Sequence, residues 1–490
     1  MRDTTILLLA LLGLLSSTWP PPLTACAAGQ HCDDTAAGAG SLPSCFLAAG
    51  VRNFSLAGSP AYDALLNFSI QNLRFALRPA GVPRPATVVL PLSRSELTSA
   101  VLCTRDASLR IRVRSSGHSC EGLSYTVGDG DDDADRVRFV VIDLMRMNRV
   151  RVDAASATTW VESGATLGEI YYAVASSSSS LAFPAGSCST VGAGGHISGG
   201  GFGLLSRKFK LAADNVLDAI LVDADGRVLD RSSMGEYVFW AIRGGGGGSW
   251  GVVYAWKLRL VQFVGPALPD EFYLSVFLTI GGGSSSSPRD GNVTVSFTGL
   301  VLGSKELAMS VLSERFPELG LAEPEMSEMS WVESAARFAG LSSTEELTSR
   351  ASRTKHYAKS KSDYVRSPIA RGAVAAILRV QYGVTWEAGE LGGEARMAWL
   401  RALYAYMAPH VSKNPRAAYV NYVDLDLGTN IALAGNVSSP SSTSPVSRAR
   451  STWGSAYFSP ANFDRLVGAK TLIDRSNVFS NAQSIPPLQI

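Results

Sequence analysis

The sequence predicts an α+β fold, in which a region of short strands is followed by a unit that mixes strands and helices. From Arg84 to Leu260, short β-branched runs alternate with turn signals, and later strand patterns alternate with helical periodicity. Hydrophobic residues make up 46% of the 490 residues and charged residues 18%, so the chain can bury sizeable cores. At ~150 residues per domain, the length suggests roughly three packing units.

Charge and composition exclude one class of partner. Lys and Arg number 44 against 42 Asp and Glu, a net charge of +2, and no basic face, zinc-finger spacing or RNA-binding motif is present. Nucleic acid is therefore not an expected partner. Many of the 47 glycines fall in runs, which indicates segments whose backbone packs closely against a neighbouring group.

The N-terminus is typical of a secretory signal. Arg2 precedes an apolar run, residues 6–15, that is too short to span a bilayer, and Ala25-Cys26-Ala27 suits a signal peptidase. We expect residues 1–27 to be removed, because Pro20-Pro21-Pro22 would interrupt a longer retained anchor. No later run is long enough for a transmembrane helix. The expected location is the apoplast or cell wall, with the vacuole as the alternative.

Two further features agree with secretion. Five cysteines remain after the signal, so at least one thiol is free or otherwise used in an oxidising compartment. Glycosylation motifs of the Asn-x-Ser/Thr type occur at Asn53, Asn67, Asn292 and Asn436.

The first half of the chain begins with a helical segment and continues as strands. Residues 41–75 carry Tyr62, Leu66 and Leu73 among apolar residues at roughly helical spacing. The predicted strands are Ala86–Leu90, Arg110–Arg114, Arg138–Leu144, Thr158–Glu162 and Val252–Val261. Asp225-Gly226 predicts a hairpin between Ile220–Val222 and Val228–Leu229, and a short helix is expected at Tyr237–Ile242.

The second half mixes both kinds of element. Strands are expected at Phe272–Ile280, Val293–Leu302, Val374–Val384 and Ala417–Leu427, and helices at Lys305–Phe316 and Ser327–Phe338. The segment 395–411 has an apolar stripe at helical spacing, and a final amphipathic segment covers Asn462–Val478. Within 395–411, Trp399, Leu403 and Met407 form an apolar stripe that indicates core packing. The acidic run Asp129–Asp135 lacks the glutamate that ends a calcium loop, so a solvated hairpin tip is expected.

Two glycine-rich segments carry reactive side chains. The first runs from Arg112 to Tyr125 and contains His118 and Cys120, and the second runs from Phe183 to Gly203 and contains Cys188 and His196. Residues without bulk let backbone N–H groups approach a phosphate or a flat ring closely.

Three interpretations of the glycine-rich segments compete. Gly246-x-Gly248-x-x-Gly251 matches a dinucleotide motif formally, but a strand follows it, where a Rossmann site needs a helix. The histidines and cysteines could ligate zinc, but the tight paired spacing of a structural zinc site is missing, so no metal is expected. The third interpretation is a cofactor bed with His118 and Cys188 as attachment points. From the residues alone, this interpretation is no better supported than an ordinary buried histidine and cysteine in glycine-rich turns.

Several ordered blocks resolve this choice through resemblance. They are Asn72–Phe75, both glycine-rich segments, Ala213–Val216, Ala241–Gly251, Phe316–Leu321, Lys361–Val365, Asn421–Gly428 and Gln483–Pro487. With them, the chain from Ser41 to Leu488 resembles the plant berberine bridge enzyme-like family. These are FAD-linked oxidases with a vanillyl-alcohol-oxidase-type (PCMH-type) FAD domain.

The resemblance implies the domain organisation. A two-part PCMH-type FAD-binding domain is joined to an α+β substrate domain with an antiparallel sheet, and a C-terminal segment returns to the flavin. The implied boundaries are 1–27 for the signal, 28–82 for the N-terminal helical part, 83–262 for the FAD-binding domain, 263–416 for the substrate domain and 417–490 for the C-terminal segment. A monomer is expected.

The resemblance also implies a bicovalent FAD, bonded through His118 and Cys188, and a disulfide between Cys45 and Cys103. Cys120, where the family usually has a tyrosine, is left without an assigned partner. The other implied cofactor-binding residues are Arg114, Ser115, Ser116, Gly117, Ser119, Gly186, Thr190, Gly192, Gly194, Gly195, His196, Gly200, Phe202, Gly203, Asn215, Val216 and Asn421.

For catalysis, the resemblance makes Tyr422 the base and Gln381 a substrate-orienting residue. Arg379 stands where relatives have a lysine, and a nearby cation favours phenolate, lowering a tyrosine pKa from ~10. The alternative is that Tyr422 is only an inward-facing strand residue beside the flavin. Val191 matches the position that controls oxygen access, and valine there is typical of an oxidase.

The sequence departs from the family at four places. Ser116 replaces a glycine, which would cost energy if that position needs a positive φ. Phe202 replaces an active-site tyrosine, and Ser455 replaces a glutamate. Between Ile369 and Gln381, relatives have several tens of additional residues. Either the substrate domain is shortened and catalysis impaired, or the sequence reflects an imperfect gene model.

The implied reaction is oxidation of a small molecule with O2 as the second partner. We expect a hydroxyl-bearing carbohydrate or phenylpropanoid alcohol to transfer hydride to FAD, with O2 reoxidising the flavin to give H2O2. The alternatives are oxidative cyclisation of an alkaloid or other specialised metabolite, and a catalytically impaired protein that only binds flavin or sugar.

Overall fold

A computed structural model describes residues 41–76, 84–126, 138–262, 272–280, 293–351, 355–365, 383–387, 392–430 and 444–488. Several predictions lie outside these ranges. They concern the signal segment 1–27, the acidic run 129–135, the glycosylation motifs at Asn292 and Asn436, most of the strand predicted at Val374–Val384, and the site residues Arg379 and Gln381.

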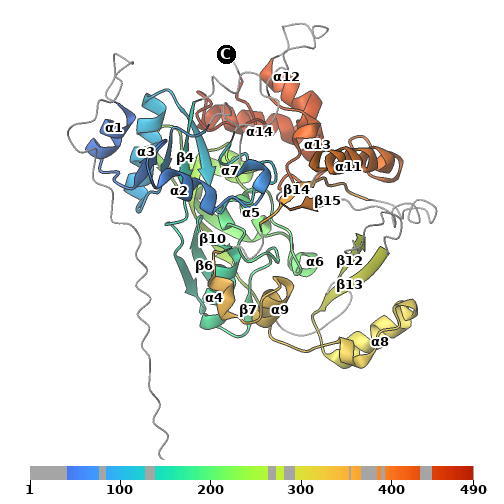
Figure 1. Ribbon diagram of the computed structural model, residues 1–490. Helices are drawn as coiled ribbons and strands as arrows, with labels where there is room; N and C mark the ends of the chain where they lie inside the picture. The colour runs from blue at the N-terminus through green and yellow to red at the C-terminus, as the bar shows by residue number, and fades with distance from the viewer. Residues whose placement is uncertain are drawn as a thin grey trace, which may run out of the picture. The chain divides into compact units, whose positions relative to one another are not determined.

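A four-stranded sheet opens the described chain, in the order β1-β2-β4-β3. Figure 1 labels its inner strand β4. Its strands are β1 Phe54–Leu56, β2 Thr87–Val89, β3 Arg110–Arg114 and β4 Phe139–Asp143. β4 is buried along its whole length and pairs in parallel with both β2 and β3, as expected of an apolar central strand. Three strand predictions are thereby confirmed, whereas β1 lies inside the segment that was predicted to be helical.

Helices flank this first sheet. They are α1 Leu42–Ala48, α2 Tyr62–Phe68 and α3 Arg94–Asp106. α3 was not predicted, although Ser93 caps its start by accepting a hydrogen bond from the Glu96 backbone N–H. The Cys45–Cys103 disulfide joins α1 to α3, as the resemblance implied.

A five-stranded antiparallel sheet follows, in the order β5-β6-β10-β8-β9. Its strands are β5 Val150–Asp153, β6 Thr158–Glu162, β8 Val216–Val222, β9 Val228–Leu229 and β10 Val252–Arg259. The hairpin β8–β9 turns at Asp225-Gly226, where Gly226 has φ +73°, so that prediction is confirmed. A short pair joins β7 Leu181–Ala182 to β11 Val261–Gln262.

The connections of this sheet carry helices that sequence periodicity mostly missed. They are α4 Leu167–Ser177, α5 Ala193–Ser198, α6 Ser206–Phe209 and α7 Arg231–Ala241. Thr166 and Glu169 form a capping box at the start of α4. α5 lies within the second glycine-rich segment, so it places that segment against β6.

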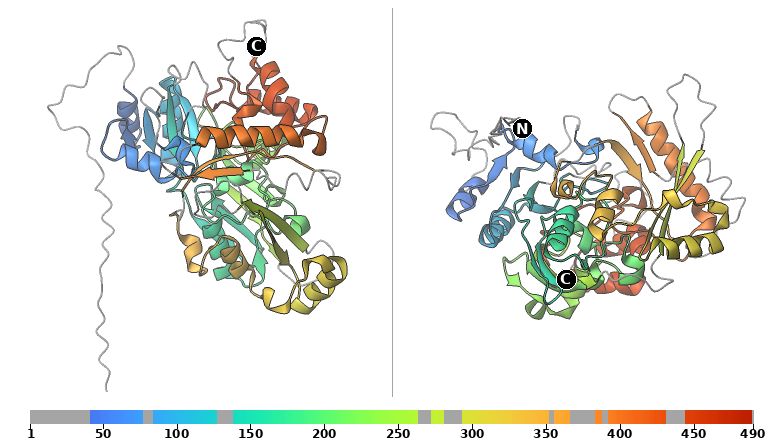
Figure 2. Two further views of the ribbon diagram at one scale, coloured as in Figure 1. Left: turned by 45° about the vertical axis from the view of Figure 1, so that its right-hand side comes forward. Right: turned by 90° about the horizontal axis from the view of Figure 1, so that it is seen from below.

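Beyond residue 271, two antiparallel strand pairs are described. β12 Phe272–Ile280 pairs with β13 Val293–Val301, and β14 Tyr357–Ser360 pairs with β15 Gly383–Trp386. Figure 2 shows β12 and β13 side by side, leading into α8 Lys305–Arg315. The next helix, α9, spans Trp331–Phe338 and packs against α4. It begins four residues later than predicted because Ser330 caps it together with Glu333.

Two predictions in the C-terminal half are wrong. In α11, Gly393–Met407, the buried face carries Met397, Leu400, Leu403 and Met407, whereas Trp399 is 37% exposed and does not belong to the core. Residues 417–427 form turns and a short 3-10 helix, Leu425–Leu427, where a strand was predicted.

The C-terminal segment is helical and packs against α7. α12 Pro445–Ala449, the π-helical turn Arg450–Gly454, α13 Ser455–Tyr457 and α14 Pro460–Ile473 follow one another, and α14 packs on α7. Among the residues that the structure describes, none of the helices has the length and apolar character that crossing a bilayer requires.

Candidate active site

A cavity of about 490 Å³ lies where both glycine-rich segments meet the C-terminal segment. This volume is typical of small-molecule and cofactor sites. Its walls come mainly from four stretches of the chain, within residues 112–124, 186–204, 245–253 and 419–423. The cavity is therefore built from segments that are up to 300 residues apart in the sequence.

The first glycine-rich loop follows β3 and folds through one glycine. Gly117 has φ +76°, and an added Cβ would collide with the Ser69 carbonyl oxygen. The positive φ falls on Gly117 rather than on Ser116, so the strain considered for Ser116 does not arise. Instead, the Ser116 hydroxyl accepts a 2.6 Å hydrogen bond from the Gly192 backbone N–H and ties the two glycine-rich segments together.

His118 and Cys188 reach the same hydroxyl group. His118 Nε2 lies 2.9 Å from Thr190 Oγ1, and Cys188 Sγ lies 3.7 Å from the same atom. Both side chains line the cavity. Burial lowers the pKa of His118 to about 4, so its ring is neutral near pH 7 and keeps a nitrogen lone pair available for bonding.

The glycine run 245–248 lines another wall, just before β10. A Cβ added at Gly246 or Gly247 would meet no atom closer than 3.4 Å, so there is open space next to both glycines. The strand that follows confirms that this run is not a Rossmann motif. The sequence shows this glycine run, but it was not predicted to line the cavity.

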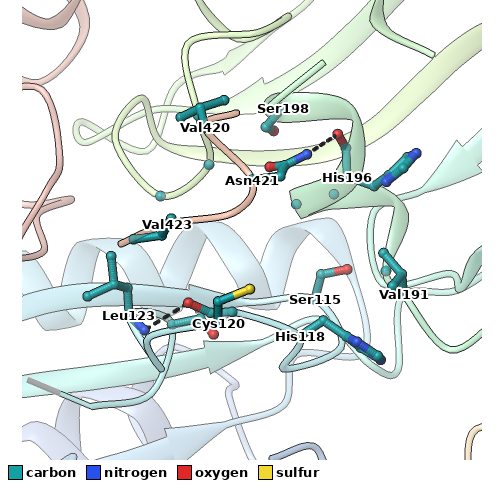
Figure 3. A pocket seen from close by; sticks show the side chains of 18 of the residues that line it. Ser115, His118, Cys120, Leu123, Val191, His196, Ser198, Val420, Asn421 and Val423 are labelled. Atoms are coloured by element: carbon teal, nitrogen blue, oxygen red, sulfur yellow. Dashed lines mark hydrogen bonds between the residues drawn. The ribbon is translucent and has the colours of Figure 1, made fainter. Parts of the chain in front are cut away.

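The residues 419–423 close the side opposite the first glycine-rich loop. In Figure 3, Ser115, His118 and Cys120 lie across the cavity from Val420 and Asn421. Asn421 Nδ2 donates to the His196 carbonyl oxygen at 3.0 Å and to the Tyr419 hydroxyl at 2.9 Å. Asn421 thereby joins the C-terminal segment to α5.

Tyr422 borders the same space, with 44% of its surface exposed and its ring packed edge-on against Tyr419. Burial raises the pKa of Tyr422, and Cys120 and Tyr419 raise it further. This is opposite to the lowering expected from Arg379, which lies outside the described residues. In the described surroundings, Tyr422 therefore holds its proton at neutral pH.

The structure places most predicted cofactor residues on the cavity wall. Those that line it are Ser115, Ser116, Gly117, His118, Ser119, Gly186, Cys188, Val191, Gly192, Gly194, Gly195, His196, Phe202, Gly203 and Asn421. Thr190 lies just behind, bonded to His118. Gly200 and Val216 are not among the lining residues.

Two other predicted residues serve the surrounding structure. Arg114 is fully buried, pairs with Asp143 at 2.6 Å, and donates to the carbonyl oxygens of Leu65 and Leu66. Asn215 Nδ2 donates to the Phe209 carbonyl oxygen at 2.9 Å. Arg114 thereby ties the end of β3, just before the first glycine-rich loop, to α2 and β4, and Asn215 binds the end of α6; neither lines the cavity.

Sequence reasoning missed several aromatic and amide residues of the cavity. Tyr419, Trp250, Tyr457 and Gln483 line it. Gln483 belongs to a block that carries the family resemblance, and Tyr419 lies two residues before another such block, Asn421–Gly428. That position in the sequence could have indicated that both residues lie near the cavity. Nothing local in the sequence indicates that Tyr457 faces the cavity.

Two observations test the zinc interpretation. No group of three or more His, Cys, Asp or Glu side chains in the described ranges is arranged to hold a metal ion. His196 Nε2 accepts a 3.1 Å hydrogen bond from the Gly186 N–H, so that nitrogen is already used, and burial lowers its pKa to about 4.

The residues present fit a flavin. A glycine-lined wall leaves room for a flat ring, and a neutral imidazole and an exposed thiol reach one point of the cavity from two different segments. His118 and Cys188 would hold the ring system, and the glycine-rich segments would contact the rest of the molecule.

Comparisons with known proteins agree with this fit. The family model for an FAD binding domain matches residues 85–232, and the model for "berberine and berberine like" proteins matches residues 418–486. The tobacco (Nicotiana tabacum) berberine bridge enzyme-like D-2 is 43% identical, covering 91% of each chain. Reticuline oxidase from Eschscholzia californica is 41% identical, covering 92% of this chain and 93% of its own.

Solved structures show the same architecture. Berberine bridge enzyme from Eschscholzia californica superposes with a TM-score of 0.81 at 40% identity, over 91% of this chain and 99% of that one. Phl p 4, a grass pollen allergen with glucose dehydrogenase activity, has a TM-score of 0.80 at 34% identity, over 92% of this chain. The tobacco alignment spans 535 positions against the 490 residues here, so part of that relative has no counterpart in this chain.

Proposed function

Because the chain belongs to the berberine bridge enzyme-like family of FAD-dependent oxidoreductases, we propose that it is a secreted oxidase of hydroxyl-bearing carbohydrates or phenylpropanoid alcohols, with FAD bonded to both His118 and Cys188. The observation that carries the proposal is the meeting of these two side chains at the Thr190 hydroxyl, on the edge of the glycine-lined cavity. Because the imidazole and the thiol are both nucleophiles and lie beside one cavity, both can form a bond to the same flavin ring.

The chemistry divides between the cofactor and the chain. When bound, FAD supplies the two-electron acceptor that takes hydride from the alcohol carbon and passes the electron pair to O2, giving H2O2. The chain's own residues bind and orient the alcohol and take its hydroxyl proton, leaving a carbonyl product. Tyr422 is the base in this proposal, with Gln381 and Arg379 in orienting and charge-supplying roles.

The aromatic side chains beside the cavity support a sugar or an aromatic alcohol as the substrate. Tyr419, Tyr422 and Phe202 form an edge-to-face aromatic series beside the cavity. Such surfaces suit the apolar face of a sugar ring or an aromatic alcohol. The glucose dehydrogenase activity of the related Phl p 4 supports the carbohydrate class.

A decisive experiment uses purified mature protein. Peroxide release is measured over a panel of oligosaccharides and monolignols, beside the mass of the flavin-bearing peptides. We expect turnover of at least one alcohol and one flavin linking the peptides that contain residues 118 and 188. Flavin lost on acid precipitation would contradict covalent attachment, and no turnover by fully flavinylated protein would favour a binding protein.

A second candidate is oxidative cyclisation of an alkaloid. It is favoured by the 41% identity to reticuline oxidase and by the 39% identity to a berberine bridge enzyme variant solved with (S)-reticuline. Adding (S)-reticuline and simpler benzylic amines to the panel separates the candidates, because a cyclase would turn them over and an alcohol oxidase would not.

The proposed secretion has its own test. Asn67 lies in α2 and Asn53 directly before β1, both partly exposed. Endoglycosidase treatment of protein from a plant host should lower its mass, and N-terminal sequencing should begin near residue 28. An unprocessed, unglycosylated chain would contradict secretion.

A further inference from the structure

Three sequence blocks that carry the family resemblance meet beside the cavity. They are Asn72–Phe75, residues 359–365 and Asn421–Gly428. Each presents polar residues two apart, the pairs being Asn72 and Arg74, Lys359 and Lys361, and Asp424 and Asp426. Lys359 lies in β14 and Lys361 directly follows it, and in extended backbone this spacing puts both side chains on one face.

The meeting point is a buried ionic cluster centred on Lys359. Its Nζ donates to Glu121 and, at 2.9 Å, to Asp424 Oδ1. Lys361 Nζ donates to the other oxygen of Asp424 at 2.6 Å and pairs with Asp426 at 2.7 Å. Lys359 and Asp424 are each only 3% exposed, and Glu121 only 2%.

Outer groups complete the cluster. Arg74 pairs with Glu121 at 3.4 Å and Arg401 with Asp426 at 3.0 Å. Asn72 Nδ2 donates to the carbonyl oxygens of Cys120 and Ala358, at 3.0 Å and 2.8 Å, linking the first glycine-rich loop to β14. All three blocks are therefore bound to one another through these ions.

Stability alone does not explain such a cluster. Buried ion pairs can usually be replaced by apolar residues of similar volume at little cost, so their position is more informative than their energy. Here Glu121 directly follows Cys120, and Asp424 lies two residues after Tyr422. The Asp424 backbone N–H also donates to the hydroxyl of the cavity residue Tyr457 at 3.0 Å.

We propose that Lys359 is a positioning residue that holds the loop of His118 and Cys120 against the segment of Tyr422, and whose charge favours the phenolate form of Tyr422. This inference rests on the proposed role of Tyr422 as the base. The titratable groups that face Tyr422 from the packed elements are Cys120, Cys188, Tyr419 and Tyr273, each of which disfavours its phenolate. Burial and the Glu121 charge raise the pKa of the Cys120 thiol to about 11, and the Lys359 charge opposes that rise.

Removing a cation and removing an anion from the cluster should shift the phenolate midpoint of Tyr422 in opposite directions. Lys359→Met removes a cation and should raise the phenolate midpoint of Tyr422, whereas Glu121→Gln removes an anion and should lower it. We expect about half a pH unit to one unit in each direction, below the ~1–3 units typical of a charge in direct contact. Burial raises the pKa of Glu121, and its pairing with Lys359 and Arg74 opposes that rise, so Glu121 contributes negative charge to the cluster at the alkaline pH of the measurement.

The test is an ultraviolet titration of tyrosinate in the flavinylated protein from pH 8 to about pH 12.5, because the Tyr422 midpoint lies above the ordinary value of ~10. Each variant is measured with and without Tyr422→Phe, so that the difference isolates Tyr422. Lys359→Arg should restore the midpoint. Lys355→Met is the matched control, because Lys355 donates to the Asn67 and Phe68 carbonyl oxygens and makes no contact with the cluster. It should leave the midpoint unchanged.

Unmoved midpoints, or shifts of the same sign, would overturn the inference. If Lys359→Met yields no folded protein, Glu121→Gln decides alone: a lower midpoint supports the proposal and an unchanged one rejects it. The proposed function fails separately, if Tyr422→Phe leaves flavin reduction at the original rate whatever the titration shows.

Discussion

Thr190 is the residue at which the two proposed attachment points come together. Its hydroxyl contacts both His118 Nε2 and Cys188 Sγ, although 70 residues separate them in the sequence. A hydroxyl can donate to a neutral imidazole and stay within reach of a thiol. It therefore holds both nucleophiles in their unbonded form without requiring either to be charged.

The lowered pKa of His118 predicts how flavin attachment depends on pH. Because the folded pKa is about 4 and the ordinary value 6.5, the ring stays neutral from pH 8 down to about pH 5. In Cys188→Ala, where only His118 can react, the rate of covalent FAD incorporation should be constant over that range. The measurement is acid-stable flavin absorbance against time. A rate that halves near pH 6.5 would show that the ring titrates normally.

Tyr422 carries the sharpest prediction at the residue scale. Tyr422→Phe should slow anaerobic flavin reduction by about 10²–10⁴-fold, as expected for loss of a general base. Since its pKa is raised and only the phenolate accepts a proton, the unmodified protein should reduce its flavin faster as pH rises above neutral. Stopped-flow flavin absorbance checks both points. Tyr172→Phe, an exposed tyrosine on α4, is the control and should change neither.

At the scale of elements, α14 is bound to the cavity wall by a buried lysine. Lys470 Nζ donates to the Ser249 carbonyl oxygen, to Asp474 and to the Phe479 carbonyl oxygen, each at 2.7 Å, and none of its surface is exposed. Ser249 belongs to the glycine-rich wall at 245–253. The C-terminal helix thus holds in place a wall that is made by residues 220 positions earlier.

Lys470→Met should destabilise the fold by about 3–5 kcal/mol, because Asp474 would remain buried without its cation. Urea denaturation followed by tryptophan fluorescence measures the change. Lys305→Met removes a lysine whose partner, Glu323, is largely exposed, and should cost at most about 1 kcal/mol. Equal losses in the two variants would contradict the anchoring role of Lys470.

Elements also show where prediction from sequence fails. Residues 417–427 have the apolar alternation of a strand, yet their backbone groups find separate partners. Tyr419 N–H donates to the Ser362 hydroxyl, Ala418 N–H to the Ala456 carbonyl oxygen, and Tyr422 N–H to the Tyr419 carbonyl oxygen. A strand needs a neighbouring ladder, and no local pattern specifies where one lies.

At the scale of the whole molecule, the cavity depends on four distant segments meeting. A ligand that contacts all of them binds the folded state only, and so stabilises it by mass action. In the double variant His118→Ala/Cys188→Ala, FAD can bind only reversibly. Its melting temperature should therefore rise with FAD concentration, corresponding to about 2.7 kcal/mol at one hundred times Kd. Differential scanning fluorimetry checks this, with riboflavin-free buffer and ATP as controls. No response to FAD would contradict binding in this cavity.

The sequence by itself determined the α+β class, most strands of the two sheets, the hairpin at Asp225-Gly226 and, through ordered motifs, the family. These depend on short-range chemistry, since side-chain period, turn residues and motif spacing are all local. Only the tertiary structure decided that Ser116 carries no strain, that Arg114 supports the wall from behind, and that Trp399 faces solvent. It alone joined Lys359 to Glu121 and Asp424, because which distant charges share a buried site depends on how the whole chain packs, and no local pattern encodes it.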